Sequence, residues 1–145
     1  MVDRLFLDAN VLFSAAYCEG AGVAALWSIK TVSLFTSSYA IEEARRNLPN
    51  REQQERLERL AKGFQTVHAA SVYDPLRNDI ELPAKDRPIL SGALTAECTH
   101  LITGDIRHFG RYFGKRLLGI HILPPADYVR EARQHAQRIA ERTCR

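Results

Sequence analysis

Short apolar runs alternate with helical patterns along most of this sequence. Apolar runs at 5–7, 32–35, 101–103 and 120–123 have the length of buried strands, and a weaker run lies at 66–69. Between these runs, apolar residues recur every three or four positions, as on one face of a helix. Strands that alternate with helices are typical of βαβ units. The sequence therefore predicts an α/β fold, in which helices cover both faces of a parallel sheet of about five strands.

Several helix boundaries carry clear signals. Pro49 ends the helix that follows the second strand, and Asn50 with Gln53 resembles a capping box. Asp86 and Pro88 open a later helix, after a loop at 73–85 in which the pattern is lost. The helix after the capping box is expected to bury Leu57, Leu60, Ala61 and Phe64. Apolar residues also recur at helical spacing at Val23, Leu26 and Trp27 in an early segment, and at Val129, Ala132, Ala136 and Ile139 in the final helix.

The composition suits a single domain spanning residues 1–145. Hydrophobic residues make up 46% of the chain, which is enough to form a core. We expect neither a secretion signal nor a membrane span, because no apolar run has the required length and flanks. The 3 cysteines are odd in number and form no paired motif. This argues against a disulfide framework or a cysteine zinc site and favours a reducing cytoplasm.

Acidic and basic residues are segregated along the chain. Residues 1–105 contain 11 basic and 14 acidic side chains, whereas residues 106–145 contain 9 basic and 3 acidic ones. Most of the basic residues are arginine, whose planar guanidinium suits phosphate groups. The basic C-terminal helix, 126–145, and the residues before it form either a solvated surface or a phosphate-binding surface beside an acidic site. The charges alone leave both interpretations open.

Four acidic residues are expected at one edge of the sheet. Asp8 and Asp105 each follow a strand directly, so they lie where parallel strands end. The helix after the second strand begins at the same edge and carries Glu43 in its first two turns. The helix that Asp86 opens also begins there, because it runs antiparallel to the strand that follows it. Ligands of open α/β sheets bind at this edge.

Carboxylates gathered in this way need a compensating charge. Two of them ~4 Å apart repel by roughly 4 kcal/mol at an effective dielectric of about 20, so the pocket must take up protons or bind a cation. Oxygen ligands with no cysteine and few histidines favour Mg²⁺ or Mn²⁺. The opposing interpretation is that each acid is an independent helix cap or surface group. The shared edge weighs against it.

Together, the sequence motifs around these four acids resemble those of the PIN-domain family of ribonucleases. The chain length is similar to that of VapC-type toxins of bacterial toxin–antitoxin pairs. The resemblance covers residues 4–125. It rests on LDANVL at 7–12, TSS at 36–38 leading into EARRNL at 43–48, DRPI at 86–89 and LITGD at 101–105. Each motif is short, and their order and spacing make the resemblance specific.

The resemblance implies a three-layer α/β/α fold with the strand order 3-2-1-4-5. Family spacing also decides between Glu42 and Glu43, since helical geometry favours Glu43 only slightly. The implied catalytic residues are Asp8, Glu43, Asp86 and Asp105, of which Asp8, Asp86 and Asp105 would bind metal, with Asn10 and Thr103 as supporting polar residues.

The sequence departs from the family pattern after the last aspartate. Many relatives carry a further acid a few residues on, where this chain has Ile, Arg and His at 106–108. The number of metal ions, one or two, is therefore open. His108 and His121 are candidate ligands or bases, although a lone histidine is more often structural. Arg107 and Arg111 are candidate substrate-binding residues, beside aromatic residues that either stack on bases or pack in the core.

The predicted activity is metal-assisted hydrolysis of RNA phosphodiester bonds, with Mg²⁺ or Mn²⁺ as the cofactor. As the resemblance implies, the protein would be the toxin of a toxin–antitoxin pair, with an antitoxin or a second copy of the chain as candidate partners. The alternative is a PIN-like module that binds RNA or protein without effective catalysis. A phosphotransferase with Asp8 as nucleophile is disfavoured, because Asn10 stands where a second aspartate is expected. Ser14 has no histidine partner in triad order, so acyl chemistry is also disfavoured.

Overall fold

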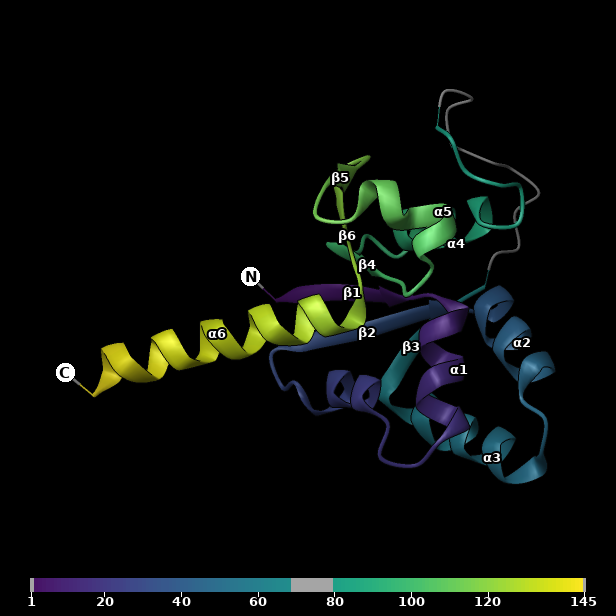
Figure 1. Ribbon diagram of the computed structural model, residues 1–145, viewed down its shortest axis with the longest axis horizontal. Coiled ribbons are helices and arrows are strands. Elements are labelled where there is room, and N and C mark those ends of the chain that lie inside the picture. The colour runs from purple at the N-terminus through teal and green to yellow at the C-terminus, as the bar shows by residue number, and fades with distance from the viewer. Residues whose placement is uncertain (1, 69–79, 145) are drawn as a thin grey trace.

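A mostly parallel sheet forms the middle layer of the protein (Figure 1). The computed structural model describes residues 2–68 and 80–144. Within them the sheet has 6 strands in the order β3-β2-β1-β4-β6-β5. Neighbouring strands are parallel except β5 and β6. The strands are β1 (Asp3–Leu7), β2 (Val32–Ser37), β3 (Phe64–Val67), β4 (His100–Ile102), β5 (Arg116–Leu117) and β6 (Ile120–Leu123).

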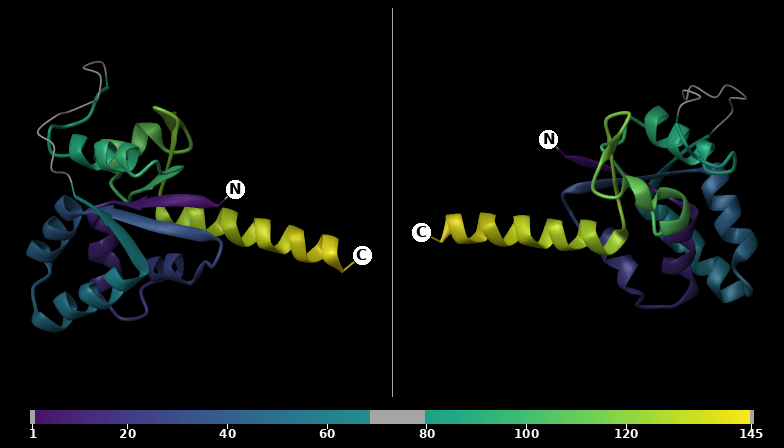
Figure 2. Two further views of the ribbon diagram at one scale, coloured as in Figure 1. Left: turned by 180° about the vertical axis from the view of Figure 1, so that it is seen from behind. Right: turned by 45° about the horizontal axis from the view of Figure 1, so that its top comes forward.

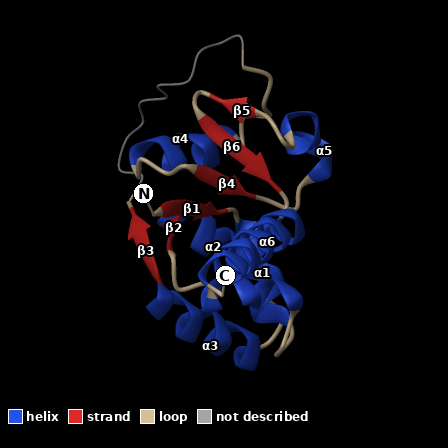
Figure 3. Cartoon of the chain, turned by 90° about the vertical axis from the view of Figure 1, so that its left-hand side faces the viewer, coloured by secondary structure: helices blue, strands red, loops and turns tan. Residues whose placement is uncertain are grey.

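Helices cover both faces of this sheet. In Figure 3, α4 lies on one side of the strands, whereas α1, α2 and α3 lie on the other, and α5 lies across β4 and β6 from α4. The fold is therefore the three-layer α/β/α arrangement that was expected. The helical segments are α1 (Ala9–Tyr17), η1 (Gly22–Ser28), α2 (Ser38–Asn47), α3 (Arg51–Leu60), η2 (Ala61–Gly63), α4 (Arg87–Thr95), α5 (Ile106–Phe109), η3 (Gly110–Tyr112) and α6 (Pro125–Thr143), with the η segments in 3₁₀ geometry.

The predicted strand order is confirmed, with β6 as the fifth strand of the expected series. The short strand β5 was not predicted. It pairs antiparallel with β6 through a two-residue turn, in which Leu118 and Gly119 both have positive φ, 53° and 83°. Such a turn matches the twist of a hairpin. A two-residue strand is too short to produce an alternating pattern, so sequence periodicity cannot reveal it.

The region around β3 differs from the predicted boundaries. The capping box of Asn50 and Gln53 is present at the start of α3, as expected. Phe64 was assigned to the buried face of that helix, but it begins β3 instead, because the chain turns through η2 before it. The predicted strand at 66–69 is therefore shifted toward the N-terminus, and its last residue lies outside the described residues. Most of the predicted loop at 73–85 lies outside them too.

The core lies between the sheet and the helices on both faces. Phe6 at the centre of the sheet is fully buried, as are Leu12 of α1 and Leu90 of α4. Gly92 lets α4 approach closely: a Cβ atom at this position would lie 2.8 Å from the ring of Phe6. This contact places α4 over β1. It thereby fixes the position of Asp86, which directly precedes α4, at the acidic edge.

The final helix α6 leaves the body of the protein (Figure 2). Tyr128 is buried in its first turns and donates a hydrogen bond to Asp3 Oδ2 at 2.7 Å. Val129 and Ala132 are half-buried, but Ala136 and Ile139 are exposed. The apolar stripe of the final helix is therefore covered only in its first turns. A 19-residue helix is about 28 Å long, whereas a 5-residue strand is about 17 Å long, so the sheet ends before the helix does.

No single helix within residues 2–68 and 80–144 has the length and apolar character needed to cross a membrane. Only α1 and η1, taken together as a pair bent by 105°, pass such a test. The apolar side chains of α1 are buried within the protein, Val11, Leu12 and Ala16 among them.

Candidate active site

The four predicted acids surround one open cleft at the carboxyl end of the parallel strands. Asp8 follows β1, Asp105 follows β4, Glu43 lies in α2 and Asp86 directly precedes α4. The structure therefore brings together the carboxylates that the topology was expected to gather. The cleft has a volume of about 530 Å³, and its other lining residues are Ala9, Asn10, Phe13, Ser14, Ala44, Asn47, Lys85 and Gly104.

Asp8 is fixed by both β4 and α1. Its backbone N–H donates to the carbonyl of Ile102 at 3.0 Å, which joins the ends of the two central strands. Its Oδ1 atom accepts a hydrogen bond from the backbone N–H of Ala9 at 2.7 Å, and its Oδ2 atom accepts one from Thr103 Oγ1 at 2.8 Å. Asp8 thus caps α1 and also lines the cleft. The two interpretations of Asp8, as a helix cap and as a member of the acidic site, are therefore compatible.

Asn10 and Thr103 connect the ends of β1 and β4 around this carboxylate. Asn10 Nδ2 donates to Asp8 Oδ2 at 3.2 Å and to Thr103 Oγ1 at 3.1 Å. Asn10 Oδ1 accepts from the backbone N–H of Gly104 at 2.7 Å, and Thr103 Oγ1 accepts from that of Asp105 at 3.1 Å. Both residues therefore contact the Asp8 carboxylate, and their supporting role stays a prediction.

Burial makes the Asp8 carboxylate costly to ionise. Asp8 is only 4% exposed, and burial raises its pKa from 3.8 to about 6. The hydrogen bonds from Thr103 and Ala9 oppose this rise, while the charges of Asp86 and Glu43 add to it. A nearby cation would reverse the balance, because an opposite charge favours the ionised form.

Asp86 has a buried carboxylate oxygen that accepts no hydrogen bond from the described residues. It is 7% exposed, and its side chain makes no capping hydrogen bond to α4. Burial raises the pKa of this carboxyl, and the nearby His108 opposes the rise. Its Oδ2 atom accepts no hydrogen bond from any described residue, although it lies 3.0 Å from His108 Nδ1. Buried polar atoms usually have a partner, so this oxygen is a candidate cation ligand.

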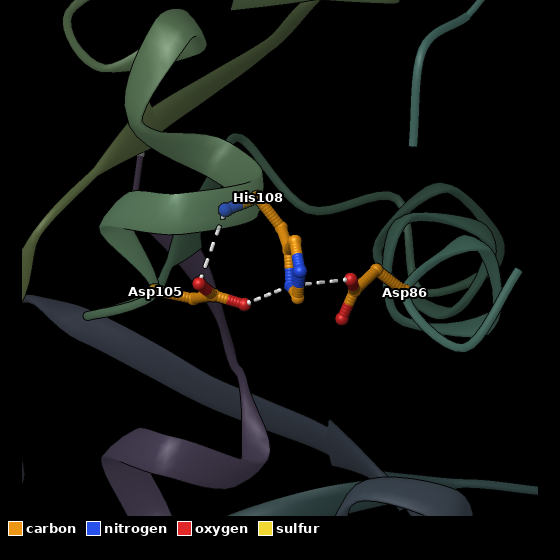
Figure 4. A group of neighbouring side chains, drawn as sticks. All are labelled: Asp86, Asp105 and His108. Carbon is orange, nitrogen blue, oxygen red and sulfur yellow. Dashed lines mark hydrogen bonds and ion pairs between the residues drawn. The ribbon is translucent and has the colours of Figure 1, made fainter. Parts of the chain in front are cut away.

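His108 lies in the short helix α5, which Asp105 precedes, and both side chains face Asp86 (Figure 4). Asp105 Oδ1 accepts from the backbone N–H of His108 at 3.1 Å, which caps α5. Its Oδ2 atom lies 2.8 Å from His108 Nδ1. The imidazole ring is thus held between two of the predicted metal-binding acids. The sequence interpretation, which favoured a structural role for His108, did not anticipate this position.

The structure also separates Glu43 from Glu42. Glu43 is half-buried and lines the cleft, whereas Glu42 is exposed and pairs with Arg45 at 3.0 Å. Ser37 caps α2 by accepting from the backbone N–H of Ala40. This cap sets the rotation of the helix, which turns Glu43 toward the other acids.

This arrangement fits a divalent cation bound mainly by oxygen atoms. Ligand atoms of Asp86, Asp105 and His108 all lie within 4.8 Å of one another. Asp8 adds a further buried carboxylate to the same cleft. A cation at this position would offset the mutual repulsion of the acids and occupy the free lone pair of Asp86.

The basic C-terminal part of the chain does not form one surface beside the acids. Arg107 is exposed on α5, and Arg111 in η3 forms an ion pair with Glu81. By contrast, α6 extends past the amino-terminal ends of the strands, away from the acidic edge (Figure 1). Arg107 and Arg111 are the first basic residues after Asp105 in the sequence. Their role in substrate binding stays a prediction.

Two further residues of the cleft were not singled out from the sequence. Lys85 is exposed on its rim, and its carbonyl accepts a hydrogen bond from the Tyr39 hydroxyl at 2.9 Å. Asn47 lies one helical turn after Glu43 and donates to its backbone carbonyl. Direct adjacency to Asp86 and the i, i+4 spacing from Glu43 were the available signals.

The fold is similar to that of a chain in the crystal structure of VapBC2 from Rickettsia felis bound to a DNA fragment from their promoter. The TM-score is 0.61 at 15% sequence identity, and the similarity covers 83% of this chain and 98% of that one. Neither a protein-family model nor a curated protein sequence matches the chain. The similarity establishes the fold, which agrees with the strand order described above.

Proposed function

We propose that this protein is a divalent-metal-dependent endoribonuclease, with Asp8, Glu43, Asp86 and Asp105 as its catalytic residues. The observation that carries the proposal is the convergence of four carboxylates, from four separate elements, on one cleft. Two of these carboxylates are buried and have raised pKa values. Crowded and perturbed acids of this kind are typical of functional sites, because they are unfavourable for folding alone.

Asp8, Asp86 and Asp105 are the proposed ligands of Mg²⁺ or Mn²⁺. When bound, such an ion supplies a Lewis acid that activates water and neutralises charge on the scissile phosphate. Thr103 and Asn10 keep the Asp8 carboxylate in one orientation through their hydrogen bonds. Glu43 stands across the cleft as a carboxylate that can orient water or accept a proton.

The RNA backbone requires cations at the border of such an acidic site. Lys85 stands on the rim of the cleft and is exposed. Arg107 is exposed on α5, two residues after Asp105, and Arg111 follows it in η3. We propose that Lys85 and Arg107 contact phosphates, with Arg111 contributing when its pair with Glu81 opens.

A place in a toxin–antitoxin pair is part of the proposal. Its support is the family resemblance of the four motifs, together with the similarity of the fold to a chain of the VapBC2 complex. The protein would be the toxin, and an antitoxin protein its partner. A second copy of the chain is a further candidate partner.

The test is RNA cleavage by the purified protein. Single-stranded and structured RNAs are incubated with Mg²⁺ or Mn²⁺, with EDTA in a parallel reaction, and the products are resolved by length. We expect internal cleavage that requires the metal. The Asp8→Asn variant should abolish cleavage and remain folded, which a thermal melt in EDTA checks.

Two results would contradict this proposal. Cleavage that persists in EDTA would exclude a metal mechanism. RNA binding without cleavage at any metal concentration would favour the alternative, a PIN-like module that binds RNA without catalysis.

A further inference from the structure

His108 occupies a position that a purely structural histidine does not require. Its Nδ1 atom lies 2.8 Å from Asp105 Oδ2 and 3.0 Å from Asp86 Oδ2 (Figure 4). The two acids come from different elements, Asp105 from the turn after β4 and Asp86 from the start of α4. One nitrogen atom therefore stands where two carboxylates converge.

A hydrogen on His108 Nδ1 cannot satisfy both carboxylates. Nδ1 of an imidazole carries at most one hydrogen, which points at one acceptor. Here the hydrogen-bond geometry is met with Asp105, and the buried Asp86 Oδ2 accepts no hydrogen bond from any described residue. Since Asp86 is 7% exposed, water replaces the missing donor poorly. Asp86, Asp105 and His108 thus offer three ligand atoms to a cation, whereas Nδ1 supplies one hydrogen at most to the two carboxylates.

The spacing of these atoms suits an octahedral metal ion. Neighbouring ligands of an octahedral ion with bonds of about 2.1 Å lie about 3.0 Å apart. The two observed separations, 2.8 Å and 3.0 Å, are close to this value. The imidazole and the two carboxylates can therefore bind one ion with small adjustments of their side chains.

We propose that His108 Nδ1 is a ligand of the same divalent cation as Asp86 and Asp105, and that this nitrogen makes the site prefer Mn²⁺ to Mg²⁺. The inference rests on the metal site of the proposed function. Mg²⁺ is bound almost entirely by oxygen, whereas imidazole nitrogen suits first-row transition ions. His108 thus selects which of the two candidate ions the protein uses.

The direct test is pulsed electron paramagnetic resonance of Mn²⁺ bound to the whole protein, without RNA. A coordinated imidazole nitrogen modulates the electron spin echo of Mn²⁺. We expect this nitrogen signal in the parent protein and in the control variant His135→Ala, whose residue is exposed on α6. We expect its loss in His108→Ala. Bound Mn²⁺ that lacks the nitrogen signal in the parent protein would overturn the proposal.

A competition titration measures the preference itself. The free Mn²⁺ signal is followed as Mg²⁺ is added, for the parent protein, His108→Ala, His108→Asp and His135→Ala. We expect the ratio of Mn²⁺ to Mg²⁺ affinity to fall about tenfold or more in both His108 variants, because a ligand is lost or becomes a carboxylate. An unchanged ratio in His108→Asp would also overturn the proposal.

These readouts keep the two proposals apart. Neither measurement involves RNA, so a protein that binds Mn²⁺ through His108 but cleaves no RNA would contradict the proposed nuclease alone. A protein that cleaves RNA with metal, but shows no nitrogen ligand, would contradict the role of His108 alone. Thermal melts in EDTA identify any variant that fails to fold, and the nitrogen signal of the parent protein needs no variant.

Discussion

The helices α4 and α6 begin alike and end differently. Each starts with a proline in its first turn and carries apolar residues at helical spacing. In α4 these residues are buried against the sheet, Ile89, Leu90 and Ala93 among them. In α6 only the first turns contact the body, and Ile139 near its end is 51% exposed. Apolar spacing therefore predicts a helix, but not how much of that helix is covered.

The difference follows from length. With 9 residues, α4 is about 14 Å long and matches the strands beneath it, whereas α6 has 19 residues and extends past the sheet. The consequence for function is that α4 positions Asp86 rigidly at the acidic edge. The distal part of α6 instead presents an uncovered face away from that edge.

The acids at the starts of these two helices allow the largest contrast. Asp86→Asn removes a buried carboxylate from the proposed metal site, so we expect metal-dependent RNA cleavage to fall about 10³-fold. Asp127→Asn in the first turn of α6 changes a half-buried acid that lies 3.6 Å from Arg130, far from the acidic edge, and should leave the rate unchanged. Cleavage rates of the two variants at saturating metal provide the measurement. Equal cleavage rates in the two variants would show that Asp86 does not contribute to catalysis.

Truncating an apolar side chain should lower the free energy of unfolding much more in α4 than near the end of α6. Leu90→Ala in α4 creates a cavity at a fully buried position, which should lower the free energy of unfolding by about 2–5 kcal/mol. Ile139→Ala in α6 should change it by less than about 0.5 kcal/mol. Urea denaturation of both variants tests this contrast. A large loss in Ile139→Ala would mean that α6 is covered in solution, for example by a second copy of the chain.

The buried Asp8 at the acidic edge should also make the free energy of unfolding depend on pH, whereas α6 contributes no such dependence. The pKa of Asp8 is raised in the folded state from 3.8 to about 6, so the folded protein binds the proton more tightly than the unfolded chain does. Its contribution to stability is fully present below about pH 4 and is lost as the pH rises through about 6. At one pKa unit per 1.36 kcal/mol, this loss reaches at most about 3 kcal/mol.

Asp8→Asn isolates that contribution. The amide carries no buried charge, but it replaces a hydrogen-bond acceptor next to Thr103 and Asn10. We therefore expect a net stabilisation on the order of 1 kcal/mol at pH 7 in EDTA, which disappears toward pH 4. Thermal melts of both proteins across this range are the measurement. A variant that melts below the parent protein at pH 7 would show that the cap of α1 is the main role of Asp8.

The smallest contrast concerns the basic residues. Arg107 lies on α5 beside the acids, whereas Arg142 lies in the last turn of α6. If Arg107 contacts one phosphate of single-stranded RNA, Arg107→Glu should reduce the slope of log affinity against log salt by about 0.7. Arg111→Glu should have a weaker effect, because Arg111 is paired with Glu81. Arg142→Glu should have none, and an equal effect of Arg107→Glu and Arg142→Glu would contradict this assignment.

Most of the architecture could be predicted because local patterns and topology agree. The apolar strand at 5–7, the capping box at Asn50 and the proline after Asp86 each act over a few residues, and the parallel topology of the strands places the acids at one edge. What the sequence did not indicate depends on distant contacts. The position of His108 requires the turn after β4 to face the start of α4, and the exposure of Ile139 requires the sheet to end first.

The central claim is that four carboxylates act together in one cleft, and adjacent glutamates of α2 test it most directly. Glu43 lines the cleft, whereas Glu42 is exposed and pairs with Arg45. The measurement is the rate of metal-dependent RNA cleavage by Glu43→Gln and by Glu42→Gln under identical conditions. We predict a decrease of about 100-fold for Glu43→Gln and an unchanged rate for Glu42→Gln. Equal rates in the two variants would contradict the claim.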